Sequence, residues 1–180
     1  MSTIIVGVSG SAACFKAVTI CSELAKRGHL VQAVLTTGAT KLVQPVQFSC
    51  VTGNQAVWDE WKPQDPSGMD HISLAREGDI LVVVPATADR ISQLAHGLAG
   101  DLLGSLSLAF ERGKPRMFVP AMNPEMWNHS ATQRNVSQLE ADGWKCIGPV
   151  EGSTACGEEG EGRMVEASEV VEAIEQMLAS

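Results

Sequence analysis

The fold is decided by a β-rich run that stops on a polar turn, Thr3-Ile4-Ile5-Val6-Gly7-Val8-Ser9-Gly10-Ser11. Apolar residues at helical spacing follow from Ala12 to Arg27 and stop at Gly28, which predicts a helix. A second β-rich run, Leu30–Leu35, then ends in Thr36-Thr37-Gly38. A strand, a helix and a strand in this order predict a βαβ unit, with two parallel strands and a right-handed crossover.

Strands and helices keep alternating along the rest of the chain. Residues 79–84, Asp-Ile-Leu-Val-Val-Val, form a continuous apolar run that is typical of a strand buried on both faces of a parallel sheet. The pattern also predicts strands at 117–119 and 144–147, helices at 39–48, 70–75, 91–97, 101–112, 132–142 and 167–178, and a loop with at most one short strand at 52–68. We therefore expect a single-domain α/β fold, with a doubly wound (Rossmann/flavodoxin-like) parallel sheet and helices on both faces.

The composition agrees with one soluble domain that spans residues 1–180. The chain has 180 residues, of which 44% are hydrophobic, so it can bury a substantial core. Its formal net charge of -8, without a cluster of Lys or Arg, disfavours nucleic acid or an anionic membrane as the main partner. No apolar run is long enough to span a bilayer, and no basic leader precedes the first apolar residues. We expect a cytoplasmic protein.

The five cysteines show no C-x-x-C spacing, which argues against a disulfide framework and a structural zinc site. No histidine has a second ligand at helical spacing, so no metal site is predicted. Cys14 and Cys21 share a predicted helix face and Cys146 lies in an apolar run, so packing explains them. Cys156 differs because it lies in the glycine- and glutamate-rich segment 151–163, which is either a flexible connector or, as we favour, a lid over a site.

Short polar residues stand at three predicted strand ends: Ser9-Gly10-Ser11, Thr36-Thr37 and Thr87. Backbone N–H groups at a helix N-terminus, with hydroxyl groups nearby, bind an anion without a cationic side chain, and a mononucleotide phosphate is the natural ligand. The glycine spacing matches neither the dinucleotide fingerprint nor a Walker loop. An ordinary turn between a strand and a helix therefore explains these residues equally well.

A second stretch, Met117-Phe118-Val119-Pro120-Ala121-Met122-Asn123-Pro124-Glu125-Met126-Trp127, also ends an apolar run abruptly. The two prolines exclude a simple continuation of a strand or a helix, so Asn123 is predicted to lie on a turn at the carboxyl end of a strand. In an open α/β sheet this edge is where ligands bind. Taken by itself, Asn123 is either a binding-site residue or an ordinary helix N-cap.

Residues Pro120–Trp127 match the P-x-M-N-x-x-M-W signature of the flavin-dependent cysteine decarboxylases, and the chain resembles this family over nearly its whole length. The other matching segments are Gly7–Ser11, His71 with the residues after it, Pro85–Arg90 and Ala155–Met164. The resemblance implies an FMN cofactor and a homo-oligomer, a trimer or a dodecamer of trimers, with FMN at the subunit interface. It implies no nucleic-acid or membrane partner.

The segment Ala155–Met164 resembles the substrate-clamping flap of the family branch that acts on the small molecule phosphopantothenoylcysteine in coenzyme A biosynthesis. In that branch the cysteinyl side chain is oxidised to a thioaldehyde, carbon dioxide leaves, and the resulting enethiol is reduced to 4′-phosphopantetheine. Two alternatives stay open. They are a peptidyl-cysteine oxidative decarboxylase of the lantibiotic type, and a non-catalytic protein that keeps the fold and binds a partner.

The resemblance also implies roles for individual residues. His71 corresponds to the family's essential histidine, as a base or an orienting group near the flavin. Asn123 would offer amide donors to the substrate carboxylate, and Cys156 would supply the late proton. The implied substrate-binding residues are Asn123, Met122, Ala155, Gly157 and Arg163.

The implied FMN-binding residues fall into two groups. Ser9, Gly10, Ser11 and Thr36 correspond to the phosphate site, and Thr87, Ala88, Asp89 and Ala121 to the ring site. The chain departs from the family at Asp89, where many members have Asn. An ionised Asp accepts hydrogen bonds but donates none, so its contacts to a flavin must differ from those of an Asn.

Overall fold

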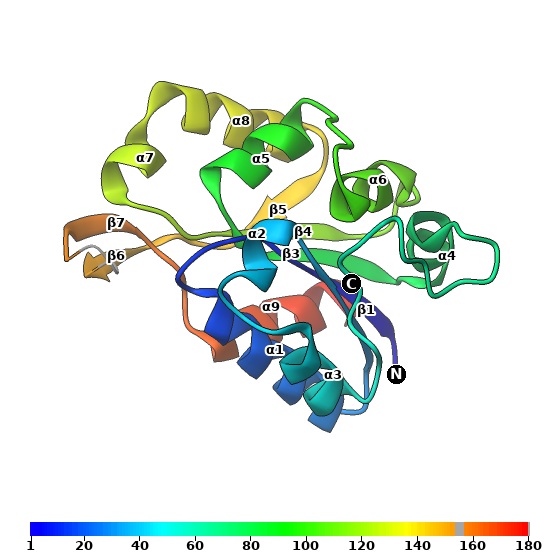
Figure 1. The fold of residues 1–180 in the computed structure, drawn as a ribbon. Coiled ribbons are helices and arrows are strands. Elements are labelled where there is room, and N and C mark those ends of the chain that lie inside the picture. The colour runs from blue at the N-terminus through cyan, green and yellow to red at the C-terminus, as the bar shows by residue number, and fades with distance from the viewer. Residues whose placement is uncertain (154–156, 180) are drawn as a thin grey trace.

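The computed structural model describes residues 1–153 and 157–179 and has a five-stranded parallel sheet at its centre (Figure 1). The strands are β1 (Thr3–Val8), β2 (Leu30–Leu35), β3 (Ile80–Ala86), β4 (Arg116–Pro120) and β5 (Trp144–Cys146). They lie in the order β2-β1-β3-β4-β5, and every pairing in this sheet is parallel. The predicted strands and the predicted doubly wound α/β fold are thus confirmed.

Helices cover both faces of the sheet (Figure 1). On one face lie α1 (Cys14–Lys26), α3 (Pro45–Thr52) and α9 (Ala167–Ala179); on the other lie α4 (Asp70–Glu77), α5 (Ala88–Ala95), α6 (Leu102–Ala109) and α8 (Ser130–Ala141). The short helices α2 (Thr37–Thr40) and α7 (Pro124–Asn128) directly follow β2 and β4. In the described part of the chain, no helix has both the length and the apolar character needed to cross a membrane.

Alternate side chains of β1 divide the core into two halves. Ile4 and Val6 are fully buried and pack with α1 and α9, whereas Ile5 is buried among side chains of α6 and α8. Each such side chain contributes roughly 1.5–3 kcal/mol through its removal from water. The same alternation continues in β3 and β4, which explains why β3 and, after Arg116, β4 are apolar without interruption.

The strand order reverses at β1. The chain passes from β1 to β2 on one side of it and reaches β3 on the other, so α1 and α5 lie on opposite faces of the sheet (Figure 1). The loops after β1 and β3 therefore diverge at the carboxyl edge. In open α/β sheets, this divergence leaves the crevice in which ligands bind.

One predicted helix was wrong. Residues 39–48 do not form a single helix, because α2 ends at Thr40 and α3 begins at Pro45. Pro45 has no backbone N–H and suits a first helical position, and Gln44 before it forms a capping box with Gln47. Residues 52–68 are irregular as expected, apart from an isolated bridge between Val34 and Val57.

The predicted loop 151–163 contains a hairpin that the sequence did not reveal. Strands β6 (Val150–Ser153) and β7 (Glu159–Arg163) pair antiparallel. Glycine and glutamate are poor strand formers, so local propensity gave no signal here, and contact with the rest of the protein decides the conformation. The hairpin extends beyond the carboxyl edge of the sheet beside α7 (Figure 1, left).

Candidate active site

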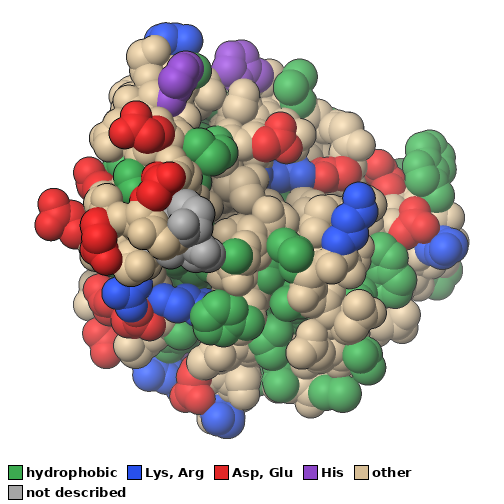
Figure 2. All heavy atoms as spheres, turned by 60° about the vertical axis from the view of Figure 1, so that its left-hand side comes forward, with side chains coloured by type: hydrophobic (Ala, Val, Ile, Leu, Met, Phe, Trp, Pro, Cys, Tyr) green, Lys and Arg blue, Asp and Glu red, His purple; other side chains and the backbone are tan. Residues whose placement is uncertain are grey.

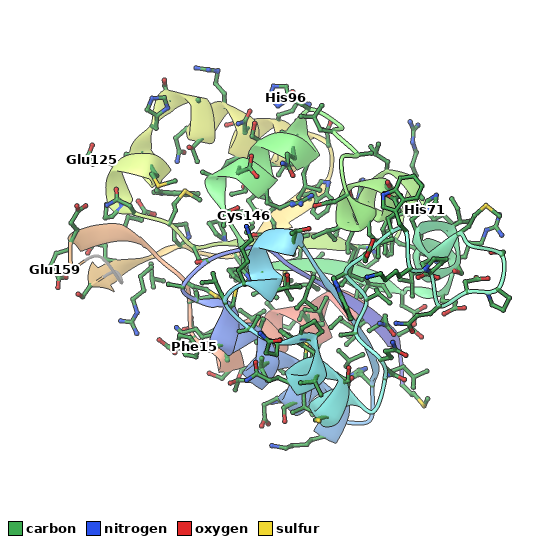
Figure 3. The ribbon with its side chains drawn as sticks, in the orientation of Figure 1. Phe15, His71, His96, Glu125, Cys146 and Glu159 are labelled. Carbon is green, nitrogen blue, oxygen red and sulfur yellow. The ribbon has the colours of Figure 1, made fainter. Side chains whose placement is uncertain are left out.

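A pocket of about 680 Å³ lies at the carboxyl edge of the sheet. It is bounded by the first turn of α1, the turn between β4 and α7, and the hairpin β6–β7. Figure 3 shows Glu125 of α7 above the hairpin and Phe15 of α1 below it. The predicted site residues that line this pocket are Ser11, Ala121, Met122, Asn123 and Arg163. Its volume suits a ligand of the size of a cofactor or a small substrate.

Asn123 uses both ends of its side-chain amide. Its Oδ1 accepts hydrogen bonds from the backbone N–H groups of Glu125 (2.8 Å) and Met126 (3.4 Å), so Asn123 is the N-cap of α7. Its Nδ2 donates to the Glu158 carboxylate of the hairpin region. The two readings of Asn123, as a helix cap and as a binding-site residue, are therefore compatible. The oxygen caps the helix, while the nitrogen donates to a carboxylate of the hairpin region.

Glycines in β7 let the hairpin lie directly on the turn after β4. The Met122 N–H donates to the Gly162 carbonyl oxygen at 3.0 Å. A Cβ atom at Gly162 would lie 2.5 Å from the Met122 carbonyl oxygen, and one at Gly160 would lie 3.0 Å from the Pro124 ring. Real Cβ atoms essentially never come as close to another atom as the Gly162 contact would require, whereas a Cβ at Gly160 would need only a small shift of the Pro124 ring. Gly162 is thus required for the backbone contact that closes this side of the pocket.

Ser9 joins the ends of β1 and β3. It is buried, its Oγ donates to the Pro85 carbonyl oxygen at 2.7 Å, and the same Oγ accepts from the Thr87 N–H at 3.0 Å. Its hydroxyl group therefore fixes the spacing of the two loops at the crevice. Thr87 in turn caps α5, where its Oγ1 accepts from the Arg90 N–H at 3.2 Å.

The loop residues around this crevice fit the phosphate of a mononucleotide such as FMN. A Cβ atom at Gly10 would lie 2.8 Å from the carbonyl carbon of Gly38, so the turns after β1 and β2 approach each other at a place that only glycine permits. Thr36 lies beside them and caps α2. This cradle of backbone and hydroxyl groups suits a phosphate oxyanion.

The residues after Thr87 divide into two kinds. Asp89 is exposed and its Oδ2 accepts from Gln93 Nε2 at 3.0 Å, whereas Ala88 is half-buried. Arg90 is buried and forms a two-point ion pair with Asp101, whose Oδ1 also caps α6. Arg90 therefore serves the fold. No local pattern predicts this pair, because Arg90 lies in α5 and Asp101, eleven positions later, is the N-cap of α6.

His71 does not join Asn123 within this chain. It lies in the first turn of α4, its side chain is 28% exposed, and its Nδ1 is 3.9 Å from Glu60 Oε1. Figure 3 shows His71 at the opposite end of the molecule from the hairpin, which carries Glu159. Cys156 and Ala155 lie outside the described residues, and Gly157 is exposed.

Three cysteines in the described ranges are packing residues. Cys14 and Cys21 are buried on one face of α1, as the sequence predicted, and Cys146 is half-buried at the end of β5. Burial raises the pKa of Cys21 to about 12. Burial and, to a lesser extent, the Glu140 carboxylate raise the pKa of Cys146 to about 12 as well. These two thiols therefore stay protonated at neutral pH and are poor nucleophiles.

Comparisons with known proteins agree with this arrangement. The model of the family described as Flavoprotein matches residues 1–179. The chain is 33% identical over 175 residues to a "Probable phosphopantothenoylcysteine decarboxylase" of Streptococcus mutans. This match covers 97% of this chain and 98% of that protein. It is 38% identical over 172 residues to the "Coenzyme A biosynthesis bifunctional protein CoaBC" of Bacillus subtilis, where the match covers 96% of this chain but 42% of that protein. The chain thus spans less than half of this bifunctional relative.

Solved structures show the same fold. A PPC decarboxylase mutant complexed with pantothenoylaminoethenethiol is 29% identical, with a TM-score of 0.87 and coverage of 99% of both chains. The FMN-dependent cysteine decarboxylase SpaF is 31% identical, with a TM-score of 0.84 and coverage of 100% of this chain and 98% of that one.

The contact of Gly162 with Met122 can be tested without any ligand. In Gly162→Ala, the added methyl group must push β7 away from Met122, so the Met122 amide should exchange its hydrogen at least about tenfold faster, the equivalent of about 1.4 kcal/mol. Hydrogen exchange read by NMR measures this. Gly100→Ala is the matched control, because its Cβ meets no atom within 4 Å. Unchanged protection of the Met122 amide in Gly162→Ala would refute the contact.

Proposed function

This chain belongs to the flavoprotein family, and from that premise we propose that it decarboxylates 4′-phosphopantothenoylcysteine to 4′-phosphopantetheine, with FMN as cofactor, in coenzyme A biosynthesis. The observation that carries the proposal is that Asn123, which lines the pocket, directs its amide nitrogen to the Glu158 carboxylate of the hairpin region. The fold around it is shared with a PPC decarboxylase at a TM-score of 0.87. The proposed catalytic domain extends over residues 1–180.

Asn123 is the proposed holder of the substrate carboxylate. Its Nδ2 already donates to a carboxylate, that of Glu158, so a substrate carboxylate fits the same place. A neutral amide is suited to decarboxylation, because it orients the carboxylate without the ion pair that would stabilise the charged ground state. Its Oδ1 is fixed by the two cap hydrogen bonds of α7, which keeps the donor in position.

FMN, when bound, supplies the two-electron oxidation of the cysteinyl side chain and returns the electrons after carbon dioxide has left. The residues proposed to hold its phosphate are Ser9, Gly10, Ser11 and Thr36, and those proposed to face its ring are Thr87, Ala88, Asp89 and Ala121. Ser9 acts through its hydrogen bonds to Pro85 and Thr87, which fix the two loops. Asp89 contributes an acceptor where an Asn would also donate.

The hairpin region is the proposed clamp over the substrate. Met122, Ala155, Gly157 and Arg163 are proposed to contact it, and Cys156 to deliver the proton that saturates the enethiol. The backbone contact of β7 with Met122 brings this region to the pocket and excludes water from one side of it. Cys156 must stay protonated for this role, unlike a nucleophilic cysteine.

The remote position of His71 supports a site that is shared between subunits. We propose a homo-oligomer, a trimer or a dodecamer of trimers, in which the flavin lies at the interface and His71 of a neighbouring subunit faces it as a base or orienting group. Free thiols at Cys14, Cys21, Cys50 and Cys146 suit the cytoplasm, where we place the reaction.

A peptidyl-cysteine oxidative decarboxylase is the second candidate, because the chain is 31% identical to the cysteine decarboxylase SpaF over its full length. Both activities begin with oxidation and loss of carbon dioxide. They differ in the last step, since an oxidative decarboxylase releases the enethiol and leaves the flavin reduced.

The product separates these two functions. Flavin-loaded protein given phosphopantothenoylcysteine should deliver saturated 4′-phosphopantetheine, detected by mass spectrometry, without net reduction of the flavin. Cys156→Ser should still release carbon dioxide but accumulate enethiol. Enethiol as the only product of the wild-type protein, or no turnover, would refute the proposed function, and full yield of saturated product from Cys156→Ser would refute the role of Cys156.

Asn123→Asp separates the two functions of Asn123. Aspartate is as good an N-cap as asparagine, so α7 should stay intact, but the substrate then meets a carboxylate in place of an amide donor. We expect kcat/KM to fall by about 10²–10³, as for the loss of one positioned donor. Asn128→Asp, exposed at the end of the same helix, is the matched control for charge. Retention of wild-type kcat/KM in Asn123→Asp would exclude the proposed contact.

Mixed oligomers test the shared site. His71→Ala and Asn123→Asp subunits should each be inactive alone, whereas oligomers assembled from an equal mixture should regain about a quarter of the wild-type rate, since one interface in four then combines both intact residues. Co-expression with two affinity tags and a decarboxylation assay measures this. A mixture as inactive as its components would place both residues in one subunit's site and contradict the proposal.

A further inference from the structure

Two basic side chains line the pocket at the carboxyl edge of the sheet, although the neighbouring hairpin is acidic. Acidic side chains gather near the hairpin in Figure 2, with basic side chains next to them. The hairpin itself contributes exposed Glu151, Glu159 and Glu161. Among the described residues that line the pocket, Lys16 and Arg163 are the cationic ones. A ligand that carries negative charge therefore has two favourable neighbours here.

Lys16 is held in position at the pocket wall. It lies in the first turn of α1, and its Nζ donates to the carbonyl oxygens of Met164 (3.2 Å) and Val165 (3.4 Å). The same Nζ lies 3.1 Å from Glu166 Oε2. Its side chain is only 15% exposed, so its charge is weakly screened by water. The ammonium group is thus preorganised for an anion.

Arg163 approaches the same carboxylate from the end of β7. Its Nη2 donates to Glu166 Oε1, so the two oxygens of Glu166 bridge the two cations. The hydrogen bond and charge of Lys16, followed by those of Arg163, hold the pKa of Glu166 below its usual range. Glu166 is 52% exposed and Arg163 is 46% exposed, so the carboxylate can turn into solvent. The Glu166 carboxylate thus occupies the position between Lys16 and Arg163 that an oxyanion of a ligand would take.

We propose that Lys16 and Arg163 form the subsite for a phosphate monoester, the terminal phosphate of the substrate, which displaces Glu166. This deepens the proposed function and rests on it. The arginine fork and the fixed ammonium match phosphate oxygens, and a dianion attracts both cations more strongly than the single charge of Glu166 does. Asn123 lines the same pocket, so one ligand can present its carboxylate to Asn123 and its phosphate to this subsite.

The phosphate of FMN is the other source of the same chemistry. The cradle that fits it involves Gly10 and Gly38, at the ends of β1 and β2. Lys16 instead extends to the segment after β7, where Met164 and Glu166 lie. The contacts of Lys16 thus lie toward β7, whereas the glycine contact of the cradle lies between the ends of β1 and β2.

The test compares ligands that differ only in the phosphate. Binding of 4′-phosphopantetheine and of pantetheine to the flavin-loaded protein is measured by calorimetry, and kcat/KM is measured for phosphopantothenoylcysteine and pantothenoylcysteine. The wild-type protein should prefer each phosphorylated compound. Arg163→Gln should reduce that preference by about 10–100-fold, as expected for a charged hydrogen bond. Arg134→Gln, which removes an exposed cation from α8, should leave it unchanged.

Glu166→Gln should have the opposite effect on phosphate binding, because it removes the negative charge that competes with the ligand phosphate. It should bind 4′-phosphopantetheine several-fold more tightly and pantetheine unchanged, which a merely structural role of Glu166 would not produce. Equal losses for both ligands in Arg163→Gln, or weaker FMN binding with an intact preference for phosphate, would overturn the subsite. Failure of turnover with an intact binding preference would instead refute the proposed reaction and leave the subsite standing.

Discussion

The candidate site depends on one backbone contact, the hydrogen bond from the Met122 N–H to the Gly162 carbonyl oxygen. It brings two segments together that are forty residues apart, the turn after β4 and the second strand of the hairpin. The contact is possible because Gly160 and Gly162 have no side chains to collide with Pro124 and Met122. It closes one side of the pocket, which the start of α1 and the turn after β4 also bound. Its position follows from the reversal of strand order at β1, which leaves a crevice at this edge.

Carboxylates of the chain itself pair with polar residues that line the pocket. The Glu158 carboxylate accepts from the Asn123 amide, and Glu166 bridges Lys16 and Arg163. In the account proposed here, a substrate with a carboxylate and a phosphate replaces both. The protein then selects between ligands by the difference in their affinities. A ligand with both anionic groups replaces both internal carboxylates, whereas a ligand with only one leaves the other internal pair intact. After loss of carbon dioxide, the product lacks the group that competes with Glu158, which favours its release.

Local sequence patterns predicted the strands of the sheet and the turn at its edge, but not the contacts between distant segments. A continuous apolar run identified β3, because a strand buried on both faces carries no polar alternation, and shorter β-rich or apolar runs identified the other strands of the sheet. The prolines around Asn123 located the turn at the sheet edge. The hairpin was missed because its glycines serve a tertiary contact and depress strand propensity. Lys16 and Glu166 were missed as partners because they are 150 positions apart. The separation of His71 from Asn123 required the structure, since spacing along the chain carries no information on distance between helices.

The most direct measurement is a crystal structure of the FMN-loaded protein with the serine analogue of phosphopantothenoylcysteine, which keeps the carboxylate and the phosphate but has no thiol to oxidise. We expect the ligand carboxylate to accept a hydrogen bond from Asn123 Nδ2, while Oδ1 still caps α7 and Glu158 has moved away. A ligand bound with the pair of Asn123 and Glu158 intact, and with its carboxylate elsewhere, would exclude Asn123 as the holder of the substrate carboxylate.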